Sequence, residues 1–325
     1  MRINESSENL RGETRLNMKQ SDVNVVVVGS INYDITSYLA EFPQANETLF
    51  AKDYKTAIGG KGLNQAVAAA RIGADVKMIG CVGDDGFGEQ AIAHLIANGV
   101  DCSRVVRSKE APTGFAAIMV NDAGDNMISV ASGANKALTP KDVVAAKDSI
   151  EAADIVITQS EVSADVIAKA LEIANASGVP TVLNPAPADP SAIQLLKHST
   201  YVTPNESETE TLTGFYPEGE LRVEDAIQKF KEYGAGTIVI TLGSRGALIS
   251  DGGAAETVEP FDVTSVDSTG AGDVFNGVFS VSIARGMEPA EAVKYASAAA
   301  AISVTRLTAD SAPTQDEVAA FLDAQ

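Results

Sequence analysis

The sequence predicts an α/β protein with a doubly wound, mostly parallel central sheet, helices on both faces and a small antiparallel β lid. Short β-branched runs alternate along the chain with Ala-rich stretches of helical periodicity, which is the pattern of repeated βαβ units. The first run, Val23–Val28, is almost continuously β-branched, as expected of a strand that is buried on both faces of a parallel sheet. These two features predict the fold class.

The remaining elements follow from the same patterns in chain order. Short apolar runs bounded by turn residues predict strands, and apolar residues spaced three or four apart predict helices. The further strands expected are Lys77–Cys81, Ile155–Thr158, Thr181–Leu183, Tyr201–Thr203 and Thr237–Thr241. The helices expected are Gln65–Ile72, Gly88–Asn98, Ala164–Ala176, Val223–Tyr233, Ala271–Arg285 and Ala290–Val304.

Two segments, residues 35–58 and 113–130, interrupt this alternation because they lack helical periodicity. Phe115–Val120 and Met127–Val130 flank a turn-rich stretch at residues 121–125, a pattern typical of a hairpin. We therefore expect one α/β domain over residues 23–325, with both segments forming the lid. The polar residues 1–22 are expected to be a disordered tail.

Composition narrows the function. The formal net charge is −20 and the sequence pI is about 4.4, which disfavours nucleic acid and anionic membranes as partners. ATP remains possible because local backbone dipoles and Mg²⁺ can outweigh the global field. Cys81 and Cys102 are the only cysteines and predict thiols in a reducing compartment. With no apolar run long enough to span a bilayer and no secretion signal, we expect a cytoplasmic protein.

The heptad Asp267–Asp273 precedes an apolar helical stretch and is the most informative motif. Gly270 and Gly272, with Ala271 between them, let backbone N–H groups approach a ligand at the positive end of a helix, which suits a phosphate. Asp273 at the mouth of this anion hole would take a proton from an attacking hydroxyl. The alternative is a Gly-rich turn that caps an ordinary helix.

Polar residues that follow predicted strands are candidates for sugar binding, because ligands bind beyond the carboxyl ends of parallel strands. Asn32 and Asp34 would share one face of an extended segment and hold two hydroxyls. Glu161 follows another strand and would accept hydroxyls. The alternatives are ordinary turn chemistry for the pair and a solvated loop charge for Glu161.

The segment Gly59–Asn64 opens a helix with three glycines in four residues. Such a segment lets the backbone approach a ligand closely, so Gly60 joins Lys61, a mobile cation, and Asn64 as candidate ligand contacts. The chain holds no GxxxxGK[ST] motif and therefore no Walker A loop. The alternative is a plain turn between the lid and a helix.

Two further strand ends suit a nucleotide. Asn205 would touch phosphate oxygens, and Glu208 would organise water around Mg²⁺; the alternative, an Asn N-cap followed by first-turn glutamates, is compatible with this role. Hydroxyls and glycines after the last predicted strand suit phosphates and ribose, namely Thr241, Gly243, Ser244 and Gly246. On its own, the turn after this strand is weak evidence for a nucleotide site.

These motifs, in this order, resemble the ribokinase or PfkB-type carbohydrate kinase family over residues 23–322. The motifs that carry the resemblance are Gly29–Asp34, Gly59–Ala74, Gly83–Asp85, Asn184–Ala188, Thr203–Glu208, Ile240–Ala247 and Asp267–Asp273. The family implies ATP-dependent transfer to the O5 hydroxyl of D-ribose, a β lid and a homodimer contact through that lid. It implies Asp273 as catalytic base, an anion hole at Gly270–Gly272, and sugar binding by Asn32, Asp34, Gly60, Lys61, Asn64 and Glu161.

The resemblance also implies nucleotide and Mg²⁺ positions at Asn205, Glu208, Thr241 and Gly243, with Ser297 aligned loosely to an adenine contact. It implies activation by K⁺, with ligand positions at Asp267, Thr269, Ser303, Arg306, Thr308 and Ser311. The chain departs from the family here, because Thr308 replaces a common glycine and the loop Leu307–Pro313 is one residue shorter. Asn46 likewise stands where a glycine usually precedes the Glu-Thr pair of the lid.

Two other functions stay open. One is a kinase of the same fold for 2-deoxyribose, a nucleoside or a keto-sugar acid; a nucleoside would need an apolar lid surface, to which Tyr33, Phe50 and Phe115 would contribute. The Asn32–Asp34 pair favours a polyhydroxylated pentose. The other is a catalytically silent sugar sensor, which the intact Asp273 and its glycines argue against.

Overall fold

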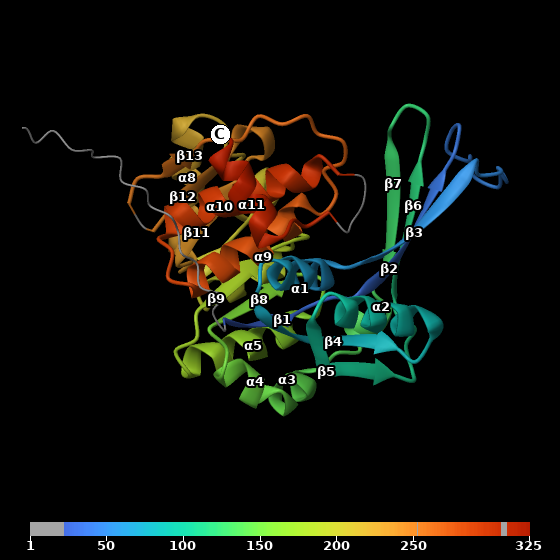
Figure 1. Cartoon of the computed structure of the whole chain (residues 1–325), viewed down its shortest axis with the longest axis horizontal. Coiled ribbons are helices and arrows are strands. Elements are labelled where there is room, and N and C mark those ends of the chain that lie inside the picture. Colours follow the sequence, from blue (N-terminus) through green and yellow to red (C-terminus); the bar gives the residue numbers. More distant parts are fainter. Residues whose placement is uncertain (1–22, 252, 307–310) are drawn as a thin grey trace, which may run out of the picture.

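The computed structural model describes residues 23–251, 253–306 and 311–325, so the expected tail at residues 1–22 lies outside the described residues. Its main body is a nine-stranded sheet between two helical layers (Figure 1). The strands of this sheet are β1 (Asn24–Val28), β4 (Asp75–Gly83), β5 (Val100–Ser108), β8 (Ile155–Gln159), β9 (Thr181–Asn184), β10 (Tyr201–Val202), β11 (Thr237–Thr241), β12 (Ala247–Ser250) and β13 (Glu256–Val258).

The strand order is β13-β12-β11-β10-β9-β8-β1-β4-β5. All neighbours from β5 to β11 pair in parallel, whereas β12 and β13 pair antiparallel at one edge. Strand β1 lies between β4 and β8, and the chain builds the sheet outward in opposite directions from there. The predicted doubly wound, mostly parallel sheet is confirmed, and a crevice beyond the carboxyl ends of β1 and β8 is the expected place for a ligand.

Helices cover both faces of the sheet. One layer holds α1 (Lys61–Arg71), α2 (Gly86–Ala97), α9 (Ala271–Ala284), α10 (Pro289–Val304) and α11 (Gln315–Asp323). The other holds α3 (Pro140–Ala145), α4 (Lys147–Glu151), α5 (Ala164–Ala176), α6 (Ile193–Leu196), α7 (Glu206–Thr213) and α8 (Glu220–Glu232). Strand β1 serves both cores, because Val25 and Val27 pack in one and Val26 and Val28 in the other. This explains its unbroken β-branched sequence.

The lid is a second sheet that projects from the main body (Figure 1). Its strands are β2 (Asn32–Tyr38), β3 (Asp53–Gly59), β6 (Gly114–Val120) and β7 (Asn126–Ala131), in the order β3-β2-β6-β7. We expected an antiparallel lid, but β2 and β6 pair in parallel, so the sheet is mixed. The reason is topological, since β2 and β6 continue the parallel strands β1 and β5 out of the main sheet in the same direction.

The sequence patterns missed some elements at the periphery. Strand β5 was not expected because it is an edge strand whose residues are mostly partly or fully exposed, and it carries no apolar run. Both cysteines are free, as expected. Within the residues that the structure describes, no helix is both long enough and apolar enough to cross a membrane.

Candidate active site

Asp273 is buried at the start of α9, where it is 6% exposed. The helix begins directly after Gly270, whose φ of 78° is a left-handed conformation that favours glycine. Both carboxylate oxygens of Asp273 accept hydrogen bonds from α1: Oδ2 from Asn64 Nδ2 and Oδ1 from Gln65 Nε2, each over 3.0 Å. The expected base is therefore held between the N-terminal turns of two helices.

The amides around Asp273 are only partly available. The N–H of Ala271 donates to the carbonyl of Ser268 over 3.2 Å, so it belongs to a turn. We expected it to be a free donor of the anion hole, and that expectation is wrong for this N–H. Among the described residues, the N–H groups of Gly270, Gly272 and Asp273 have no protein acceptor. First-turn donors of this kind bind anions at helix N-termini.

Glu161 is not a solvated loop charge. Its Oε2 accepts a hydrogen bond from Ser30 Oγ over 2.5 Å and another from the backbone N–H of Lys61 over 3.0 Å. Gly60 has no side chain to cap α1. Glu161, which is distant in the sequence, supplies the acceptor for the first N–H of the helix, that of Lys61. The carboxylate therefore joins the root of the lid to the start of α1.

Gly60, directly before α1, and Gly62, in its first turn, serve the packing of the chain itself. A Cβ at Gly62 would lie 2.6 Å from the backbone nitrogen of Ser30, and one at Gly60 would lie 2.9 Å from that of Asn32. The close approach that we expected toward a ligand is used here between α1 and the segment that connects β1 with β2. These contacts place Lys61 and Asn64 beside the sugar-binding candidates.

Asn32 and Asp34 lie on β2 of the lid, with Asn32 only 5% exposed. Asn32 Oδ1 accepts a hydrogen bond from Asn135 Nδ2 over 2.7 Å. Asp34 is partly buried, and its Oδ1 has no hydrogen-bond partner within the described part of the chain. Burial and the nearby charge of Glu161 raise the pKa of Asp34 to about 6. An acceptor left unpaired in this way is suited to a hydroxyl of a ligand.

Lys61 stands among three carboxylates. Burial alone would lower its pKa, but the negative charges of Asp273, Glu161 and Glu208 together raise it above its ordinary value. Its ammonium group therefore stays charged between the candidate sugar residues and the candidate nucleotide residues. This position suits a cation that contacts a phosphate.

Asn205 and Glu208 form a capping box at the start of α7. Glu208 accepts from the N–H of Asn205 over 2.8 Å and from its Nδ2 over 3.0 Å, while Asn205 Oδ1 accepts from the N–H of Glu208 over 2.8 Å. The helix-cap interpretation is therefore correct. Glu208 is 8% exposed, and burial raises its pKa, so a carboxyl with little solvent contact faces the same region as Lys61.

The second nucleotide candidate is the turn after β11. Thr241 forms an isolated parallel bridge with Asn205, and its N–H donates to the carbonyl of Pro204 over 3.0 Å. Gly243 and Gly246 have φ values of 56° and 86°, which favour glycine. Ser244 is exposed beside them, and Ser297 is partly buried on α10.

Many of these residues line one cavity of about 220 Å³. Its lining contains the predicted residues Lys61, Asn205, Glu208, Thr241, Gly270, Gly272 and Asp273, and in addition Asn184, Ala186, Thr203, Ser268 and Asn276. The other candidates for the sugar, the nucleotide and the anion hole are not part of this lining, namely Asn32, Asp34, Gly60, Asn64, Glu161, Gly243, Ser244, Gly246, Ala271 and Ser297. Asn64 and Glu161 are linked to it through their bonds to Asp273 and Lys61.

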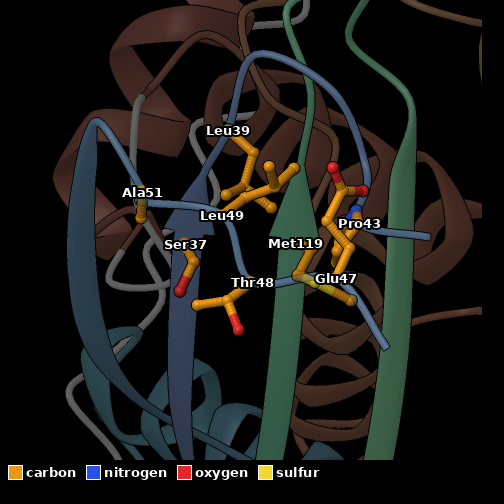
Figure 2. A pocket seen from close by; sticks show the side chains of 8 residues that line it. All are labelled: Ser37, Leu39, Pro43, Glu47, Thr48, Leu49, Ala51 and Met119. Carbon is orange, nitrogen blue, oxygen red and sulfur yellow. The ribbon is translucent and has the colours of Figure 1, made fainter. Parts of the chain in front are cut away.

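A second cavity, of about 320 Å³, lies in the lid (Figure 2). It is lined by Ser37, Leu39, Pro43, Glu47, Thr48, Leu49, Ala51 and Met119. Its one titratable residue, Glu47, accepts a hydrogen bond from the N–H of Gln44 over 2.8 Å. In the same loop Asn46 has a φ of 69°, which explains why a glycine suits this position and why asparagine, which also tolerates it, can replace glycine.

The predicted K⁺ ligands come together only in part. The N–H groups of Val266 and Asp267 both donate to the carbonyl of Val304, over 2.7 and 3.1 Å, so this segment lies at the end of α10. Arg306 donates to the carbonyl of Ser311 over 3.3 Å. Ser303 and Ser311 are buried, Thr269 is exposed, and Thr308 lies outside the described residues.

Tyr33 and Phe115 of the lid face away from the sugar candidates. Tyr33 stacks on Phe87 of α2 with ring centroids 4.1 Å apart, and Phe87 in turn lies 6.4 Å from Phe115. Successive residues of a strand point to opposite faces, so Tyr33 lies on the face opposite Asn32 and Asp34. The nucleoside surface that we considered is therefore not formed by Tyr33 and Phe115, and Phe50 is 96% exposed.

Sequence reasoning missed a buried row of polar residues beneath Asp273. Gln159, Asn184 and Thr203 come directly from the ends of three neighbouring parallel strands, and all are at most 6% exposed. Thr203 Oγ1 donates to Asn276 Oδ1 over 2.5 Å, and Asn276 Nδ2 donates to the carbonyl of Gly272 over 2.8 Å. The signal was present, because each polar residue ends an apolar run.

Comparison with known proteins shows the family to which this chain belongs. The model of the pfkB family of carbohydrate kinases matches residues 22–316. The ribokinase of Haemophilus influenzae is 38% identical over 300 residues, which are 92% of this chain and 98% of that protein. A deoxyribokinase of Salmonella typhi is 34% identical over 288 residues, which are 87% of this chain and 93% of that protein.

Among solved structures, Arabidopsis thaliana ribokinase complexed with ribose and ATP is similar with a TM-score of 0.86 and 29% identity, covering 93% of this chain and 99% of that one. The fold and the site thus define an α/β phosphotransferase. The chain belongs to the pfkB family of carbohydrate kinases, whose members transfer phosphate from ATP to sugars.

Proposed function

We propose that this kinase transfers the γ-phosphate of ATP to the O5 hydroxyl of D-ribose. The observation that carries the proposal is the placement of Asp273 in a cavity that Lys61 and Glu208 also line. Asp273 is a buried carboxylate at a helix N-terminus, and the N–H groups beside it have no acceptor within the part of the chain that the structure describes. A base, an anion site and a cation in one crevice are the parts that phosphoryl transfer requires.

The residues divide into a sugar set and a nucleotide set. Asn32, Asp34, Gly60, Lys61, Asn64 and Glu161 bind the sugar between the lid and the main sheet, and the closed lid excludes water. Asp273 accepts the O5 proton as the oxygen attacks the γ-phosphorus in line, and the N–H groups of Gly270 and Gly272 stabilise the developing charge. Asn205, Glu208, Thr241, Gly243, Ser244, Gly246 and Ser297 bind the nucleotide.

Mg²⁺ fits beside Glu208, because this buried carboxyl is oriented by Asn205 and faces the cavity. The ion would neutralise charge on the ATP phosphates, and Glu208 would order the water molecules that Mg²⁺ retains. K⁺ would lie near Asp267 and Ser303, where the buried Ser311 Oγ has no partner among the described residues. Activity measured with and without K⁺ tests this second ion.

A 2-deoxyribose kinase is the second candidate, because a deoxyribokinase is among the relatives of this chain. Asp34 Oδ1, a buried oxygen without a partner among the described residues, favours ribose instead, since 2-deoxyribose offers one hydroxyl fewer. A silent sugar sensor would need no buried base at an anion site, so Asp273 argues against it.

A coupled assay of ADP formation over ribose, 2-deoxyribose, a nucleoside and a keto-sugar acid tests the proposal. We expect the highest kcat/KM for ribose, with ribose 5-phosphate as the product. A higher kcat/KM for 2-deoxyribose would instead identify 2-deoxyribose as the substrate. Ribose binding in calorimetry without ADP formation, in the presence of Mg²⁺ and K⁺, would instead indicate a sensor.

We also propose a homodimer through the lid. Ile128 and Val130 of β7 are 58% and 55% exposed, and their register places them on the same lid face as Ala116 and Ile118 of β6. An apolar face on a sheet with open edges is a site for association with a second copy.

A further inference from the structure

The side-chain amide of Asn184, beneath the candidate base, can adopt only one of its two flipped orientations. Its Nδ2 donates to the backbone carbonyl of Thr203 over 3.0 Å. A carbonyl oxygen can only accept, so the amide nitrogen must face it and Oδ1 must face the other way. Oδ1 in turn accepts from Gln65 Nε2 over 3.1 Å.

Gln65 is fixed in the same way. Its Nε2 donates to both Asn184 Oδ1 and Asp273 Oδ1, over 3.1 and 3.0 Å, and its Oε1 accepts from Gln159 Nε2 over 2.8 Å. Gln65 and Gln159 are both 0% exposed. Reversing the Gln65 amide would set its oxygen against two acceptor oxygens and its nitrogen against a donor, without water to compensate.

We propose that Gln65 is a positioning residue for the phosphoryl-transfer step, oriented through Asn184 by the backbone of Thr203. The proposal rests on the role of Asp273 as the base. Gln65 at Oδ1 and Asn64 at Oδ2 fix the plane of the carboxylate. Asp273 is thereby kept ready to accept a proton from one direction.

This arrangement differs from a merely structural polar core in its consequences. A structural role predicts that loss of Gln65 lowers the free energy of unfolding and leaves turnover per folded molecule unchanged. A positioning role predicts a loss in kcat with little change in sugar binding, because displacement of a reacting group by about 1 Å costs up to about 10²-fold. It also predicts that a change of the side chain at position 65, which contacts Asp273, alters the pH dependence of kcat.

Gln65→Met and Gln65→Glu separate the two roles. For Gln65→Met we expect kcat to fall about 10- to 100-fold, with KM for the sugar within about threefold. For Gln65→Glu we expect the acid limb of the kcat–pH profile to move to higher pH, because two neighbouring carboxyl groups compete for one proton. Should Gln65→Met fail to fold, two other variants decide the question: Gln65→Glu, which preserves size and can donate one hydrogen bond when its carboxyl is protonated, and the milder Gln159→Met, which leaves both donations of Gln65 in place.

Thr158→Val is the matched control. Thr158 lies next to Gln159 on β8, is 0% exposed, and its Oγ1 has no partner among the described residues. This isosteric change should leave kcat, KM and the pH profile at their wild-type values. Wild-type kcat and an unshifted pH profile in folded Gln65 variants would overturn the proposal, whereas full turnover in Asp273→Asn would overturn the proposed function itself.

Discussion

Asn135 donates its Nδ2 to Oδ1 of Asn32 over 2.7 Å and thereby decides which end of the Asn32 amide remains for a ligand. The backbone of Ile31 fixes Asn135, since its N–H donates to Asn135 Oδ1 over 2.9 Å and its carbonyl accepts from Nδ2 over 3.2 Å. Asn32 is left with Nδ2, a donor, next to the acceptor of Asp34. The pair suits two hydroxyls, one accepting and one donating.

Asn32→Asp tests this polarity. The carboxylate keeps the bond from Asn135 but replaces the donor with an acceptor, so we expect the sugar Kd measured by calorimetry to rise about 10-fold, in line with loss of a buried hydrogen bond. Asn126→Asp introduces the same charge at an exposed position of β7 and should leave Kd unchanged. An unaltered Kd in Asn32→Asp would mean that Asn32 does not contact the sugar as a donor.

Asp273→Asn should lower kcat by about 10²- to 10⁴-fold, because it keeps the shape of the side chain but removes the proton acceptor. Sugar binding should change modestly, since the other sugar candidates remain. A coupled assay gives kcat and calorimetry gives Kd for the same preparation. Near-wild-type turnover would remove Asp273 from the role of base.

The raised pKa of Asp34 predicts that the stability of the protein depends on pH. Burial and Glu161 raise its pKa to about 6, so the fold favours the protonated carboxyl; the stability that this contributes is present at low pH and is lost as pH rises through about 6. Asp34→Asn should therefore raise Tm at pH 8 by about 2–4 °C and raise it less at pH 5, because the loss of stability runs from the ordinary pKa of 3.8 to about 6 and is only partly complete at pH 5.

Sugar affinity should show the opposite trend. If the ionised Asp34 accepts hydroxyl donors, the wild-type Kd for ribose rises as pH falls through about 6, and Asp34→Asn weakens binding most above pH 6, where the wild-type carboxyl is ionised. Equal Tm gains at pH 5 and pH 8, or a Kd that does not change with pH, would contradict this account of Asp34.

Gly277 allows α9 to approach α1. A Cβ at this position would lie 2.6 Å from the carbonyl oxygen of Gln65 and 2.8 Å from Ala68 Cβ. Gly277→Ala should lower the free energy of unfolding by about 1–3 kcal/mol, as overpacking does, and should lower kcat because Asp273 moves away from Gln65. Urea denaturation measures the first effect. Gly86→Ala, with no atom within 4 Å of the new Cβ, should be neutral or slightly stabilising.

The lid face predicts the oligomeric state. Val130→Lys places a charge on the apolar face of β7 and should convert a dimer to a monomer in sedimentation experiments, because burial of an unpaired charge opposes association. Leu221→Lys, at a 77% exposed position of α8, should leave the mass unchanged. A wild-type chain that sediments as a monomer would refute the lid dimer.

The sequence by itself determined the parallel core and the turn and helix that carry Asp273. Val23–Val28 required burial on both faces, and the heptad that ends at Asp273 required a turn before a helix, because both signals are local in the chain. The helix cap at Asn205 and Glu208 was also readable, since the two residues lie within one turn.

Only the tertiary structure decided the directions and partners of these groups. The parallel pairing of β2 with β6, the hydrogen bonds of Glu161 to Ser30 and Lys61, and the hydrogen bonds of Asp273 to Asn64 and Gln65 join segments far apart in sequence. Burial of Gln65, Gln159 and Asn184 likewise depends on where strand ends meet. Periodicity reports which face of an element is apolar, but the orientation of a buried amide is set by a backbone group on another element.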